Sequence, residues 1–95
     1  MAVCIRLKFD GATQEQYDTV HGHLGVDESP PDGLIFHAAG PIHDGWGVLD
    51  FWESRDAFDR FVGGRLMPAL RELGERGMPN PPDVQEFPVH HFTKP

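Results

Sequence analysis

The chain has 95 residues, of which 39% are hydrophobic and 24% charged, and its formal net charge is −7. Seven Phe, two Trp and one Tyr are too many large apolar side chains for a disordered chain, and the length is typical of one domain. Because 15 Asp and Glu outnumber eight Lys and Arg, neither nucleic acid nor an anionic membrane is an expected partner. We therefore expect residues 1–95 to form a single domain.

The cysteine content and the N-terminus indicate the compartment. Cys4 is the single cysteine, so it has no partner for an internal disulfide bond. Arg6 and Lys8 interrupt the apolar stretch at the N-terminus, which is typical of neither a signal peptide nor a membrane span. These features favour a cytoplasmic protein.

The first two predicted elements are a strand and a helix. Apolar and polar side chains alternate over residues 3–9, which is the period of a strand. Thr13 and Gln16 have the spacing of a capping box, so a helix is expected over residues 13–24. Gly25 is the expected end of this helix.

Two strands that are apolar on both faces follow, at residues 34–39 and 46–53. The Pro- and Gly-rich segment before them is a turn, and residues 40–45 between them have the composition of a hairpin loop. The two strands are therefore expected to pair with each other.

A broken helix and a last strand complete the chain. Ser54 is the expected N-cap of the second helix, and the Gly-Gly pair at residues 63–64 weakens or bends it. Pro68 fits best in the first turn of a following helical segment. The last strand is expected over residues 83–93, at a sheet edge or bulged at Pro88, which lacks an N–H group.

The order β-α-β-β-α-β predicts an α+β fold of the ferredoxin-like, split βαβ type. It consists of a four-stranded antiparallel sheet with helices on one face. Two helices cover only one face, yet the second and third strands are apolar on both, so a single chain would expose a large apolar patch. We therefore expect a twofold homodimer. The alternative is that residues 90–95 fold over the open face.

Four stretches carry a resemblance to a known family: GLIFHAAG at residues 33–40, GWGVLDFWES at 45–54, AFDRF at 57–61 and FPVHHF at 87–92. Together they resemble the dimeric α+β-barrel superfamily, and within it the small antibiotic biosynthesis monooxygenase-like proteins. The resemblance implies a homodimer in which each subunit keeps a pocket between its sheet and helices. It also implies one of several activities: cofactor-free oxygenation of aromatic polyketides, isomerisation, cyclisation or haem degradation. The quinone-forming branch uses an Asn in the pocket, whereas the only Asn here is Asn80, in the Pro-rich connector.

His37 and Asp50 are the candidate catalytic residues because each interrupts an apolar strand, where an unpaired polar group is costly. In one hairpin register His37 lies opposite Asp50, and in the register shifted by one residue it faces Leu49. We favour the first, since two isolated polar groups are most stable when paired. Asp50 would then orient His37 as a general base. The alternative is that the pair is structural, in the core or at the dimer interface.

Five further residues are candidates for substrate binding. Trp46 and Trp52 share a strand face and could form the wall of a pocket for a flat molecule, or be plain core. Tyr17 and His21 lie on the inner face of the predicted first helix. The Tyr17 hydroxyl could reach a ligand, or Tyr17 could be a core residue bonded to the backbone. His91, on the last strand, could reach the pocket or the partner chain, or be exposed.

The sequence contains no Gly-rich phosphate loop, no GxSxG motif and no metal-ligand spacing, so no cofactor and no metal are expected. The predicted function is a cofactor-independent enzyme of secondary or degradative metabolism. A general base would form an enolate or phenolate from an apolar aromatic or polyketide-like substrate, which is then oxygenated, isomerised or cyclised. The alternatives are a non-catalytic homodimer that binds a hydrophobic metabolite or assists a biosynthetic enzyme, and a metal-binding protein.

Overall fold

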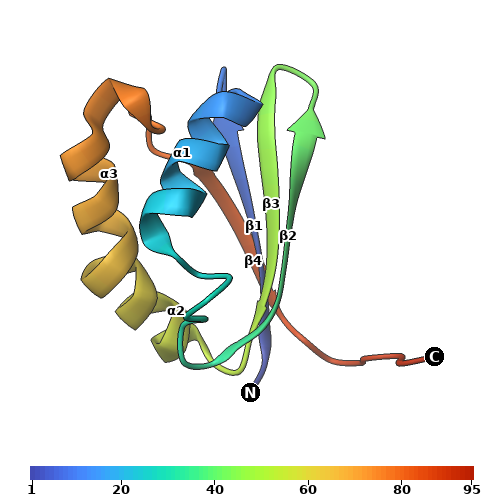
Figure 1. The fold of residues 1–95 in the computed structure, drawn as a ribbon. Helices are drawn as coiled ribbons and strands as arrows, with labels where there is room; N and C mark the ends of the chain where they lie inside the picture. The colour runs from blue at the N-terminus through green and yellow to red at the C-terminus, as the bar shows by residue number, and fades with distance from the viewer.

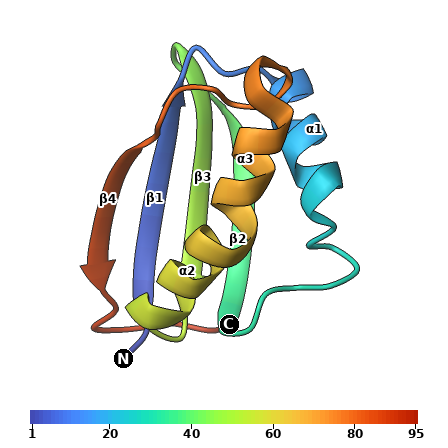
Figure 2. The ribbon, with the colours of Figure 1, turned by 90° about the vertical axis from the view of Figure 1, so that its left-hand side faces the viewer.

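A four-stranded antiparallel sheet forms one layer of the computed structural model, which describes residues 1–95. Its strands are β1 (Val3–Asp10), β2 (Leu34–Ile42), β3 (Gly45–Trp52) and β4 (Asp83–Pro88). They lie in the order β2-β3-β1-β4 (Figure 1, Figure 2). Every neighbouring pair is antiparallel, which confirms the predicted ferredoxin-like α+β fold.

The helices cover one face of this sheet (Figure 2). In α1 (Gln14–Leu24), Thr13 and Gln16 form the predicted capping box, and Gly25 ends the helix in the left-handed conformation at φ 66°. None of the helices has the length and apolar character needed to cross a membrane.

The second helical region is continuous but irregular. Ser54 caps α2 (Arg55–Phe61) as predicted, by accepting a hydrogen bond from the backbone N–H of Ala57. A π-helical turn, Val62–Leu66, contains the Gly-Gly pair and leads into α3 (Met67–Leu73). Pro68 lies in the first turn of α3, as predicted, directly after the π-helical turn.

Two strand ends differ from the prediction by more than one residue. β2 extends to Ile42 and contains an irregularity between Leu34 and Phe36. β4 ends at Pro88, so the strand predicted to reach residue 93 is wrong in its second half. The reason is that β1, the neighbour of β4, begins at Val3, and only Ala2 remains to bond Val89. Residues 89–95 then leave the sheet (Figure 1).

The two faces of the sheet have different surroundings. The near face, which carries Asp50 and Trp52 of β3, packs under the helices. The core there consists of buried residues from every layer: Val3, Ile5, Leu7, Phe9, Val20, Trp46, Val48, Trp52, Ala57, Phe58, Leu73 and Met78.

The far face, on the opposite side of the strands, is largely uncovered and carries large apolar side chains beside Arg6 and Lys8 of β1. Phe36 is 55% exposed and Phe87 57% exposed. The ring of Phe92, in the C-terminal segment, packs 5.6 Å from that of Phe51, so the segment covers a small part of this face. Residues 90–95 therefore do not hide the far face, and the large apolar patch expected of a single chain is present.

Candidate functional site

A cavity of about 70 Å³ lies between the near face of the sheet, α1 and the segment that joins α1 to β2. Its wall is mostly apolar, with Val26 and Pro31 contributed by the joining segment and Trp52 by β3. Four polar side chains also line it: Tyr17, His21, His37 and Asp50. An apolar pocket with a few convergent polar groups is the usual form of a small-molecule site.

His37 and Asp50 form a close pair in this wall. The β2–β3 register places His37 opposite Asp50, as predicted. The Nδ1 atom of His37 lies 2.6 Å from Oδ1 of Asp50, and Trp52 donates a hydrogen bond of 3.3 Å from Nε1 to Oδ2. Because a carboxylate only accepts, it holds the His37 proton on Nδ1 and leaves Nε2 as the acceptor in the neutral ring. The Asp50 side chain is only 7% exposed, so these two donors replace most of its water.

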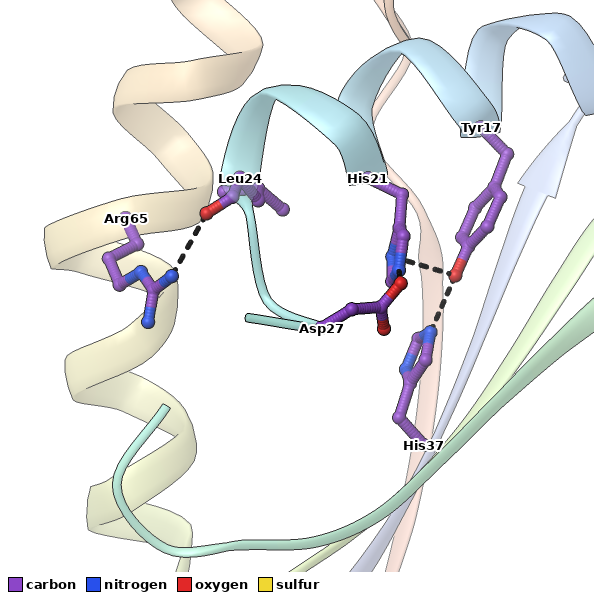
Figure 3. Close-up of polar contacts among 6 residues, drawn as sticks. All are labelled: Tyr17, His21, Leu24, Asp27, His37 and Arg65. Carbon is purple, nitrogen blue, oxygen red and sulfur yellow. Dashed lines mark hydrogen bonds and ion pairs between the residues drawn. The ribbon is translucent and has the colours of Figure 1, made fainter. Parts of the chain in front are cut away.

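The Nε2 atom of His37 is also occupied. It lies 2.6 Å from the hydroxyl of Tyr17, which in turn lies 3.1 Å from Nδ1 of His21 (Figure 3). Tyr17 and His21 are four residues apart on α1 and therefore share one helix face. Burial, followed by the negative charge of Asp50, raises the pKa of Tyr17 from 10 to about 12. The phenol therefore keeps its proton at neutral pH.

A second carboxylate stands at the outer end of this chain of contacts. Nε2 of His21 lies 3.0 Å from Oδ2 of Asp27, whose side chain is 78% exposed (Figure 3). Arg65 donates hydrogen bonds of 3.0 Å to the carbonyl oxygens of Leu24 and Ser29, and so ties the segment that carries Asp27 to the second helical region. Asp27 is not among the residues that the sequence pattern indicated. The available indication was an acidic residue just beyond the Gly25 helix end, within reach of a histidine in the last turn.

Comparisons with known proteins bear on the fold. No family model and no curated protein sequence matches the chain. Among solved structures, Rv0793 from Mycobacterium tuberculosis matches with a TM-score of 0.68 at 16% identity, covering 99% of this chain and 100% of that one. A candidate antibiotic biosynthesis monooxygenase from Chloroflexus aurantiacus matches with a TM-score of 0.66 at 16% identity, covering 98% of each chain.

SnoaB, a cofactor-independent oxygenase from Streptomyces nogalater, matches with a TM-score of 0.65 at 13% identity, covering 96% of this chain and 94% of that one. The chain shares the α+β fold of these proteins. The resemblance noted in the sequence is thereby confirmed for the fold, and at these identities it transfers no residue roles.

Within this fold, two predicted binding residues lie outside the cavity. Trp46 packs its ring 5.5 Å from that of Tyr17 but does not line the cavity, and its buried Nε1 has no hydrogen-bond partner in the chain. His91 lies in the segment beyond β4 and contacts Thr93 at 2.9 Å. Because β4 ends at Pro88, that segment turns away from the helices. No three His, Cys, Asp or Glu side chains come together as metal ligands.

Proposed function

We propose that the chain is a cofactor-independent enzyme that removes a proton from a small apolar molecule bound in the cavity, with His37 as the general base. One observation carries this proposal: His37 stands in the cavity wall between a buried carboxylate and a phenol, 2.6 Å from each. Asp50 fixes the tautomer and stabilises the imidazolium that forms when His37 gains a proton.

The geometry supports proton transfer through Tyr17. The acidic group of the substrate donates its proton to the Tyr17 oxygen while the Tyr17 proton passes to Nε2 of His37. The products are an enolate or phenolate in the cavity and an imidazolium paired with Asp50. Such an anion is the common intermediate of isomerisation, cyclisation and reaction with dioxygen. The similarity of fold to SnoaB, a cofactor-independent oxygenase, favours the last of these.

The cavity volume limits the substrate. About 70 Å³ is less than the cavity of about 150 Å³ that accepts benzene in another protein. Even one ring therefore requires an outward movement of the segment that carries Val26 and Pro31. The Arg65 contacts to Leu24 and Ser29 restrain this segment, so we expect them to break or shift when a ligand binds.

We further propose that the protein is a homodimer whose far faces meet. The exposed apolar side chains of the far face support this, because a second copy of the same face is complementary to them in polarity. The cavity lies on the opposite side of the sheet and stays accessible in this arrangement.

A second candidate function is binding without catalysis. It is favoured by the fact that both ring nitrogens of His37 already have partners in the ligand-free chain. The two candidates differ in whether any bound molecule is chemically changed.

The test is turnover of a panel of one-ring and two-ring phenols and hydroquinones under air, followed by oxygen uptake and mass spectrometry of products. His37→Gln should lower the rate about 100-fold or more, the usual contribution of a general base, with an unchanged melting temperature. His43→Gln, in the exposed β2–β3 hairpin, is the matched control and should keep the wild-type rate. If His37→Gln turns over a substrate at the wild-type rate, the proposal is wrong.

A further inference from the structure

We propose that Asp27, His21, Tyr17, His37 and Asp50 form one proton relay between the cavity and solvent, with Asp27 as its outlet. This inference rests on the proposed function, since it describes how the base returns to its starting state. Four contacts link the five side chains in series, at 3.0, 3.1, 2.6 and 2.6 Å from the Asp27 end to the Asp50 end.

A count of protons shows why the series can accept one. Each of the four contacts needs one hydrogen between its two heavy atoms. With both carboxylates ionised and both imidazoles neutral, His21, Tyr17 and His37 supply three hydrogens in total. One contact then brings two acceptors together. A fourth proton fills every contact, so a proton taken from a ligand completes the series.

The same count gives the path by which the proton leaves. In the filled state His37 donates to both Asp50 and Tyr17, Tyr17 donates to His21, and His21 donates to Asp27. Transfer of the Nε2 proton of His37 to Tyr17, of the Tyr17 proton to Nδ1 of His21, and of the Nε2 proton of His21 to Asp27 leaves a protonated Asp27 carboxyl. Asp27 is largely exposed and releases that proton to water. Each step moves one proton along an existing contact.

Both ring nitrogens of His37 have a partner, while the side chain as a whole is 27% exposed. Nδ1 faces Asp50 and Nε2 faces Tyr17, so a proton that leaves the ring passes first to one of these two groups. Asp50 is buried and its second oxygen accepts a hydrogen bond from Trp52, so Asp50 has no further group to which it could pass a proton. The Tyr17 side continues to the surface through His21 and Asp27, whose side chains are 22% and 78% exposed.

No other titratable group interrupts the series. β1 and the second helical region present only apolar side chains to the cavity, namely Leu7 and Phe9 from β1 and Phe61 and Leu66 from the helices. Asp18, exposed on α1, adds negative charge near Tyr17 without a contact in the series. It therefore provides a control of equal charge.

The experiment measures NMR saturation transfer between water and the Nε2–H of His37, the proton that leaves through Tyr17, in the ligand-free, ¹⁵N-labelled full chain with the series in its filled state. We expect Asp27→Asn and Tyr17→Phe to slow this exchange about tenfold or more, because each removes one member of the relay. Asp18→Asn should leave the rate within twofold of wild type. Asp27 is exposed, so its variant is expected to fold, and backbone spectra verify this.

Exchange in Asp27→Asn within twofold of wild type would overturn the relay, because the proton would then reach water without Asp27. Slowing of equal size in Asp18→Asn would also overturn it, since charge alone would explain the effect. The measurement requires no substrate. If exchange does not depend on Asp27 but turnover depends on His37, the proposed function stands without the relay. If exchange depends on Asp27 but turnover does not depend on His37, the relay stands without the proposed function.

Discussion

Replacement of Asp50 by Asn tests the two hydrogen bonds that this carboxylate accepts. Asp50 takes one hydrogen from His37 and one from Trp52, through its two oxygens. An amide has one acceptor oxygen and one NH₂ donor, so it cannot satisfy both partners in the same way. The variant changes the charge and one lone pair while it keeps the shape of the side chain.

The two orientations of the amide have different costs. If its oxygen faces His37, the Nε1–H of Trp52, a residue only 1% exposed, loses its partner, at about 1–3 kcal/mol for a buried unsatisfied donor. If its oxygen faces Trp52, the NH₂ group donates to Nδ1 and forces the His37 proton to Nε2. The second orientation costs less, about 1 kcal/mol for the exchange of a charged acceptor, but it reverses the tautomer that the base needs.

We therefore expect Asp50→Asn to lower the free energy of unfolding by about 1–3 kcal/mol and to abolish proton abstraction. Urea unfolding followed by circular dichroism measures the first effect, and ¹⁵N shifts of the His37 ring report the tautomer. Trp52→Phe and the double variant complete a cycle, in which coupling of about 1–2 kcal/mol is expected if the Trp52 bond is lost. Wild-type stability together with an unchanged His37 tautomer would refute this description of the site.

Three other predictions concern the cavity wall, the joining segment and the far face. Because the pKa of Tyr17 is raised from 10 to about 12, the contribution of Tyr17 to stability is present below pH 10 and is lost as the pH rises toward 12. The difference in unfolding free energy between wild type and Tyr17→Phe, measured in urea, should therefore shrink by about 1 kcal/mol over that range, allowing for solvent screening. A difference that stays constant with pH would contradict this prediction. Gly33→Ala should destabilise the fold by at least about 2 kcal/mol, since Gly33 has φ +87° and an added Cβ would lie 2.5 Å from the Cβ of Ala57. Gly11→Ala is the control: Gly11 has φ +72° but open space around it, so this variant should lose only about 1 kcal/mol. In light scattering, wild type should have twice the mass of one chain, and Leu49→Asp on the far face should have the mass of one chain. Val84→Asp on the near face is the control and should stay dimeric. A monomeric wild type would refute the dimer.

The strand pair that carries the site was predictable because two local patterns agree. His37 and Asp50 each interrupt an apolar run, and only one hairpin register pairs them. The helix start at Thr13 was equally accessible, since a capping box is a contact between residues three apart. These features depend on neighbours in the chain or across one hairpin.

Features that depend on distant elements were not predictable in the same way. The end of β4 is set by where β1 begins, so the alternation of residues 83–93 did not reveal it. Trp46 and Trp52 share one strand face, yet the ring of Tyr17 packs on Trp46 and only Trp52 reaches the cavity. The contact of Asp27 with His21 depends on the path of the segment after α1, which has no periodicity to indicate it.

The central claim is that His37 takes a proton from a molecule bound in the cavity, and 4-nitrophenol tests it most directly. Its phenolate absorbs visible light and its neutral form does not, so absorbance reports the proton transfer itself. At a pH where the free probe is mostly neutral, wild-type protein should raise the phenolate absorbance, with NMR shifts at Val26 and Leu34 that show binding in the cavity. His37→Gln should bind the probe without that rise. Equal phenolate formation in both proteins, or no shifts at the cavity residues, would contradict the claim.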